Sequence, residues 1–212
     1  MKSILLIVVL VAVIAASACI VPDDSGTETP TPATPAPKTP TTPTATTTPE
    51  TPPTMADAIP GGELPESFTL RAVLDKNTET VDMMEEAAIM VSGSLDVGEI
   101  VDAVQGIYAA TGEITDTHIT IIECTDSVNA ANAARNYKNQ SKFENPPART
   151  VSRFATASFN GHEANEVRTA PPTEDGNIRY GYFWSNGNFV VIVEPGTSDK
   201  SASMELARMT GY

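Results

Sequence analysis

IRYGYFWSNGNFVVIVE, residues 178–194, is the stretch that decides the fold. Asn186-Gly187 separates two apolar runs, and Asn and Gly accept the positive φ angles of a tight two-residue turn, so the pattern predicts a β-hairpin. A two-residue turn at this point predicts three cross-strand pairs: Trp184–Phe189, Tyr182–Val191 and Tyr180–Val193. The alternate residues Phe183, Val190 and Ile192 form a second apolar face. Because both faces are apolar, we expect this hairpin to lie in the middle of a sheet.

The same signal occurs earlier in the chain. Asn160-Gly161 separates residues 151–159 from residues 162–169, which predicts a second hairpin. Further upstream, Phe68–Leu74 alternates as a strand does, and residues 80–90 have the charged face of a short helix.

The segment after residue 95 is ambiguous. Asp96 as a cap, Glu99 three residues later and apolar residues at helical spacing predict a helix that begins near residue 96. Beyond Val104 the assignment stays open between Gln105 and Asp116. Residues 105–111 either continue the helix or form a strand that turns through Gly112 onto a strand at residues 117–124.

Two further helices are predicted. Residues 126–142 have a narrow, alanine-rich apolar stripe and a cap at Asp126 or Thr125, and residues 198–209 have a cap at Ser198. The whole pattern predicts an α+β fold, mostly an antiparallel sheet with helices packed on it, in a single domain over residues 61–212. This order of elements loosely resembles the PsbP-like fold of exported and lipid-anchored proteins.

The first eighteen residues have the features of an export signal. Lys2 is followed by an apolar run over residues 4–14 and by small residues up to Cys19. Ser17 and Ala18 before Cys19 resemble the lipobox of prokaryotic lipoproteins, although Ala16 stands where Leu is more usual. The resemblance implies that Cys19 is lipidated and that membrane lipid is a partner of the chain. The alternatives are an ordinary cleavable signal and an uncut membrane anchor.

Residues 19–60 are predicted to be a disordered spacer. Thr and Pro dominate from Pro22 to Pro60, and no aromatic residue occurs before Phe68 to support a core, so the N-terminal third is not expected to be globular. A lipobox followed by a Thr/Pro-rich spacer resembles the cell-surface lipoproteins of archaea, particularly methanogens. The resemblance implies a lipid-anchored protein on the extracytoplasmic face of the cell membrane.

The chain is acidic, with a formal net charge of −14. Residues 61–126 hold 14 acidic and two basic side chains, a balance of −12, whereas residues 127–212 hold eight acidic and nine basic side chains, a balance of +1. No strongly basic face can be built from these numbers, which excludes nucleic acid as a partner.

Catalytic and metal-binding motifs are missing from the sequence, and no cofactor is predicted. His162-Glu163 lacks the second histidine of a zinc-protease motif and lies in a predicted strand, where the two side chains point to opposite faces. His118 begins a separate strand. Cys124 ends an apolar strand between Glu123 and Asp126, which predicts a buried, unreactive thiol.

Two kinds of polar site remain as hypotheses. Asn139-Gln140-Ser141 is an N-glycosylation sequon at the end of a predicted helix. A carboxylate pair for glycoside hydrolysis would draw on Glu123, Glu163 or Glu166.

The sequence therefore favours a membrane-anchored binding module for an unknown ligand or envelope protein, rather than an enzyme. A small extracellular hydrolase and a structural or stress-related envelope protein are the alternatives. An enzyme would show a concave pocket with at least two convergent titratable groups of perturbed pKa. A binding module would show an apolar or aromatic surface patch without such groups.

Overall fold

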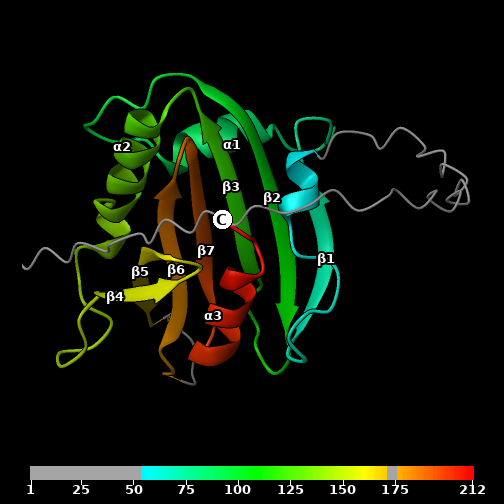
Figure 1. Ribbon diagram of the computed structural model, residues 1–212. Helices are drawn as coiled ribbons and strands as arrows, with labels where there is room; N and C mark the ends of the chain where they lie inside the picture. The colour runs from blue at the N-terminus through cyan, green and yellow to red at the C-terminus, as the bar shows by residue number, and fades with distance from the viewer. Residues whose placement is uncertain (1–53, 171–175) are drawn as a thin grey trace, which may run out of the picture. The chain divides into compact units, whose positions relative to one another are not determined.

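The computed structural model describes residues 54–170 and 176–212, which form a seven-stranded antiparallel sheet with helices packed on both faces (Figure 1). The strand order is β1-β2-β3-β7-β6-β5-β4. The strands are β1 (Phe68–Leu74), β2 (Ile100–Ala110), β3 (Thr117–Cys124), β4 (Phe154–Phe159), β5 (His162–Thr169), β6 (Arg179–Asn186) and β7 (Phe189–Thr197). The predicted α+β class and antiparallel sheet are confirmed.

The helices divide between the two faces of the sheet. The α3 face is covered by the 3-10 helix η1 (Met55–Ala58) and by α3 (Lys200–Arg208), and its core includes Trp184 and Leu206. The α2 face is covered by α1 (Met83–Met90) and α2 (Ser127–Lys138), and a second 3-10 helix, η2 (Ser141–Phe143), follows α2. β7 lies between β3 and β6, and it buries apolar side chains on both faces because helices cover both. This central position is the one that the hairpin pattern predicts.

The predicted register of the β6–β7 hairpin is wrong by two residues next to the turn and by four at Tyr180, which lies opposite Thr197 beyond a register shift. Trp184 lies opposite Val191, and Asn186 lies opposite Phe189, so the turn residues are Gly187 and Asn188. Only Gly187 of these two has positive φ, at 57°. A shift of two residues keeps every side chain on its predicted face, since side chains alternate with a period of two.

The first hairpin follows its prediction. Phe159 lies opposite His162, and both turn residues have positive φ, 51° at Asn160 and 83° at Gly161. These angles are those that a tight two-residue hairpin turn requires.

The predicted helix from residue 96 is also wrong, because residues 100–110 form β2. Asp96 accepts a hydrogen bond from the Gly98 backbone N–H at 2.9 Å, and Gly98 has a φ of 60°, so a turn ends there instead of a helix beginning. From Ile100 the chain pairs with both β1 and β3, which satisfies its backbone groups outside a helix. The alternative strand over residues 105–111 is the correct one.

The remaining helices differ from prediction mainly at their ends. Asp126 caps α2 as predicted, whereas Asp199 rather than Ser198 caps α3. Packed structure also includes residues 54–60, which the sequence assigned to the spacer. Ile59 is buried in the core, and the Tyr108 hydroxyl donates a hydrogen bond to the Pro60 carbonyl at 2.7 Å. Residues 1–53, with Cys19 among them, lie outside the described part of the chain.

Candidate functional site

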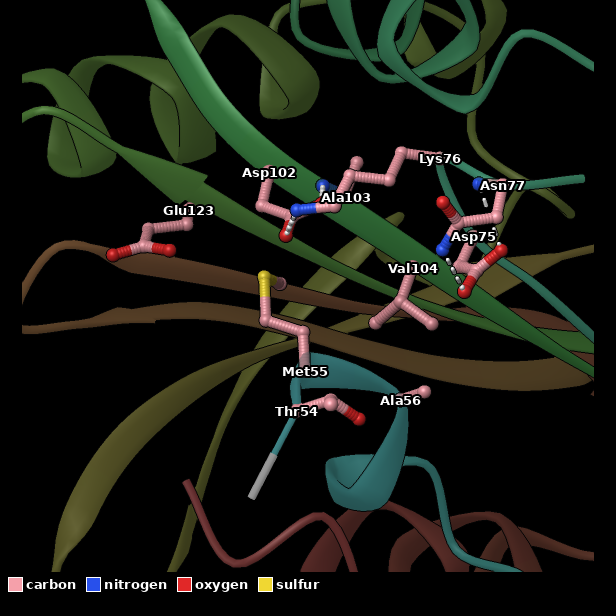
Figure 2. Close-up of a pocket in the computed structure, with 10 residues that line it drawn as sticks. All are labelled: Thr54, Met55, Ala56, Asp75, Lys76, Asn77, Asp102, Ala103, Val104 and Glu123. Atoms are coloured by element: carbon pink, nitrogen blue, oxygen red, sulfur yellow. Dashed lines mark hydrogen bonds and ion pairs between the residues drawn. The ribbon is translucent and has the colours of Figure 1, made fainter. Parts of the chain in front are cut away.

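A pocket of about 360 Å³ opens beside η1, at one end of β1, β2 and β3; we call it the η1 groove (Figure 2). Its lining comes from four segments: Thr54–Ala56, the turn Asp75–Asn77, Asp102–Val104 of β2, and Glu123 of β3. Figure 2 shows the Met55 side chain extending from η1 toward the strands. The groove thus combines an apolar wall from η1 with a rim of charged side chains.

The charge of the η1 groove is negative, with three carboxylates against one ammonium group. Lys76 Nζ lies 2.6 Å from Asp102 Oδ2, and this hydrogen bond raises the Lys76 pKa above its ordinary value. Asp75 accepts hydrogen bonds from the Asn77 side chain and backbone, which lower its pKa. Glu123 accepts a hydrogen bond from Asn188 Nδ2 at 3.0 Å. Hydrogen bonds thus fix the carboxylates that line the groove, and their negative charge suits the binding of a cationic group.

A second, smaller pocket lies between α2 and strands β5 and β6. Its lining includes Arg135 and Lys138 from α2, Glu163 and Asn165 from β5, and Ser185 from β6. Lys138 Nζ donates a hydrogen bond to Asn165 Oδ1 at 2.8 Å. In this pocket Glu163 lies among cationic residues and has no second carboxylate beside it in the lining.

The three glutamates considered for hydrolysis do not come together. Glu163 and Glu166 point to opposite faces of β5, and β6 and β7 separate β5 from the Glu123 strand, a distance of about 14 Å at ordinary strand spacing. Glu166 is 1% exposed and bonds Arg168 Nε at 2.6 Å and Lys200 Nζ at 2.7 Å. Its geometry is that of a buried ion pair which holds the start of α3 on the sheet.

His118 and Glu194 form a polar cluster on the α2 face with Lys142. His118 Nδ1 lies 3.3 Å from Glu194 Oε2, and Lys142 Nζ lies 3.8 Å from Glu194 Oε1. The hydrogen bond to Glu194 raises the His118 pKa above its ordinary 6.5. Burial alone would raise the Glu194 pKa, but the bond from His118 and the Lys142 charge outweigh it and lower that pKa.

These pKa shifts predict a pH-dependent contribution to stability. Because its pKa is raised on folding, protonated His118 stabilises the fold below about pH 6.5, and this contribution is lost as the pH rises through the folded pKa. Because its pKa is lowered on folding, ionised Glu194 stabilises the fold above about pH 4.5, and this contribution is lost as the pH falls through the folded pKa. Both groups are about a third exposed, so the gain is expected to stay below about 1 kcal/mol. Denaturant unfolding should show that His118→Gln destabilises at pH 6 and has a smaller effect at pH 9. An equal effect at both pH values contradicts this assignment.

The other residues considered in the sequence, His162 and Cys124, lie in packed surroundings. His162 stacks on Trp184 with ring centroids 6.0 Å apart, and Cys124 is a buried free cysteine whose pKa is raised by burial. The buried position of Cys124 agrees with its prediction. Asn139 is exposed at the C-terminal cap of α2, and its glycosylation stays a prediction.

Within residues 54–170 and 176–212, no group of three or more His, Cys, Asp or Glu side chains could hold a metal ion. No helix in the same ranges is long and apolar enough to span a membrane.

Sequence reasoning missed the η1 groove. Asp75, Lys76 and Asp102 belong to no motif, and they meet because β1 and β2 pair from Phe68 and Ala110 at one end to Leu74 and Gln105 at the other. The excess of acidic residues between positions 61 and 126 was the only signal, and it does not point to individual residues.

Comparison with known proteins leaves the family open. No protein-family model matches the chain, and no curated protein matches its sequence. Among solved structures, the extracellular domain of PknH from Mycobacterium tuberculosis is similar at 9% sequence identity, over 68% of this chain and 84% of that chain, with a TM-score of 0.38.

Proposed function

We propose that the chain is a lipid-anchored surface protein whose domain binds a positively charged ligand or partner segment in the η1 groove. The observation that carries the binding proposal is the convergence of Asp75, Asp102 and Glu123 around one pocket with a single ammonium group, Lys76. Among the described residues that line the groove, two negative charges then remain without a cation. Since like charges repel, an amine or guanidinium group entering there is favoured over a carboxylate or a phosphate.

Anchoring at the extracytoplasmic face of the cell membrane is proposed from the signal segment and Cys19. It is supported by the small residues before Cys19 and by the Thr/Pro-rich segment between Cys19 and the domain. Mass spectrometry of the mature N-terminus is expected to find a lipid-modified Cys19. An N-terminus at another residue, or an unmodified Cys19, contradicts lipidation.

The η1 groove meets the criterion set above for an enzyme, because titratable groups of shifted pKa converge there. The hydrolase alternative draws no support, however, from Glu123, Glu163 and Glu166, which lie apart in the sheet. The three glutamates have different partners. Glu123 accepts a hydrogen bond from Asn188, and Glu166 forms ion pairs with Arg168 and Lys200. Glu163 lines the pocket beside α2. Glycoside hydrolysis needs two carboxyl groups within about 10 Å of each other. A structural envelope protein is the remaining alternative, and the binding experiment addresses it.

The groove is tested with a lysine-rich peptide as the probe and the full chain as the protein. The variant Asp75→Asn/Glu123→Gln removes two charges and leaves one acceptor oxygen on each side chain. At residue 75 the bond from the Asn77 backbone N–H can be kept, whereas the bond from Asn77 Nδ2 is lost. We expect it to bind the peptide at least about tenfold more weakly in calorimetric titration at physiological salt.

The matched control is Glu85→Gln/Glu86→Gln on the exposed side of α1, which removes the same charge outside the groove. We expect this control to bind as the wild-type chain does. Equal weakening in both variants would mean that the peptide responds to net charge alone, and no binding to the wild-type chain would also contradict the proposal.

A further inference from the structure

The two edges of the sheet differ in how well they are protected. Among the strands of residues 54–170 and 176–212, β1 and β4 each have a neighbour on one side only. An unprotected edge strand offers a row of backbone N–H and C=O groups to another chain. Figure 1 shows β1 and β4 at opposite margins of the sheet.

The free backbone groups of β4 can be assigned from its pairing with β5. The Arg168 backbone N–H donates to the Arg153 carbonyl at 2.9 Å, which marks these two residues as a hydrogen-bonded pair. Because such pairs alternate along an antiparallel ladder, Ala155, Ala157 and Phe159 bond β5. The N–H and C=O groups of the alternate residues therefore point away from β5; these residues are Phe154, Thr156 and Ser158.

β4 has no charge, proline or bulge that would protect its edge. Its six residues, FATASF, include no charge and no proline, and its pairing with β5 is regular from Phe154 to Phe159. Thr156 and Ser158 are exposed. Charges, prolines and bulges are the means by which natural edge strands avoid pairing with other chains.

β1 has two of these protecting features. Its pairing with β2 is interrupted by a register shift between Leu70 and Ala72, and Arg71 carries a charge that pairs with Asp116 at 3.1 Å. It also belongs to the half of the domain with a charge balance of −12, so two copies meeting there would repel. β4 belongs to the half with a balance of +1, where this repulsion is absent.

We propose that β4 is a self-association edge, at which two copies of the chain pair antiparallel with Thr156 of one copy opposite Thr156 of the other. Phe154 of each copy then lies opposite Ser158 of the other, so every outward-facing residue of β4 meets another outward-facing residue. Three hydrogen-bonded pairs supply about six backbone bonds. Opposed threonines are a favourable cross-strand pair, and no charges oppose one another.

The partner that pairs with the β4 edge is a second copy of the chain, because β4 is complementary to itself in this register. A twofold axis through the Thr156 pair uses the same patch on both copies, as closed dimers do. A single strand pair is smaller than a standard protein interface, so the dimer is expected to be weak in dilute solution. Trapping by a disulfide is therefore the more sensitive measurement.

The first test is oxidative cross-linking of the full chain with Thr156→Cys. Hydrogen-bonded partners have Cα atoms about 5.5 Å apart, within reach of a disulfide. Ser158→Cys is the matched control, because its copy lies four residues further along the partner strand, about 13 Å away. The wild-type chain controls for Cys19 and for the buried Cys124.

We expect at least about tenfold more disulfide dimer from Thr156→Cys than from Ser158→Cys. Equal yields would mean that the cysteines react through random collisions and that the two strands have no fixed register. Absence of dimer from Thr156→Cys would exclude the pairing. Either result overturns the proposal.

The second test places like charges opposite each other. Thr156→Lys should weaken self-association at least about tenfold in analytical ultracentrifugation, whereas Thr69→Lys, at an exposed position of β1, should leave it unchanged. Circular dichroism checks that both variants fold. A wild-type chain that stays monomeric at millimolar concentration, or an equal response of both variants, overturns the proposal.

Discussion

Replacing Arg168 and Lys200 together by methionine is expected to lower the free energy of unfolding by about 3–5 kcal/mol. Glu166 is 1% exposed, and these two cations are its ion-pair partners at 2.6 Å and 2.7 Å. With both gone, the buried carboxylate would have no compensating charge, and burying an unpaired charge is strongly unfavourable. Chemical denaturation of the double variant against the wild-type chain measures the loss.

The single variants and a triple variant complete this test. Lys200→Met should cost less than Arg168→Met, because the Lys200 side chain is 48% exposed and that of Arg168 is 22% exposed. Adding Glu166→Leu to the double variant should recover part of the loss, since it removes the buried charge itself. If the double variant is as stable as the wild-type chain, the cluster does not hold α3 on the sheet.

Asn136→Ala is expected to cost about 3 kcal/mol, because Asn136 makes three hydrogen bonds inside the protein. Its Oδ1 accepts from the Leu95 N–H at 3.1 Å, and its Nδ2 donates to the carbonyls of Val91 and Leu95 at 3.0 Å and 2.8 Å. Asn136 is 2% exposed. The variant would leave buried backbone groups without these partners and release the loop between α1 and β2.

Asn132→Ala is the matched control for Asn136. It lies one turn earlier on α2 and makes a single hydrogen bond, to the Asp96 carbonyl at 2.8 Å, at an exposed site. Its loss should cost about 1 kcal/mol or less. Thermal unfolding of both variants decides the matter, and equal effects would show that burial of Asn136 contributes nothing.

Several elements could be predicted from the sequence because their signals are local. Asn160-Gly161 has the residues that a two-residue hairpin turn requires. Asp126 has the side chain of a helix cap and caps α2. Alternating apolar residues placed β6 and β7 in the centre of the sheet even though their register shifted by two residues. The turn moved to Gly187-Asn188 because glycine alone can supply the positive φ of that turn type.

The error at β2 shows the limit of periodicity. Asp96, Glu99 and the spacing of the valines fit a helix, but Gly98 has a positive φ and the segment pairs on both sides with strands β1 and β3. The apolar positions of a strand buried on both faces also fit a helix over so short a stretch. Pairing with distant strands therefore decided what local spacing left ambiguous.

The sequence by itself determined the α+β class, the presence of the two hairpins and the excess of negative charge in residues 61–126, since composition, turn chemistry and alternation are properties of neighbouring residues. Only the tertiary structure decided the strand order, the convergence of Asp75, Asp102 and Glu123 at η1, and the position of β4 at an edge. The physical reason is that these features depend on contacts between residues far apart in the chain, whose free energies no local pattern encodes.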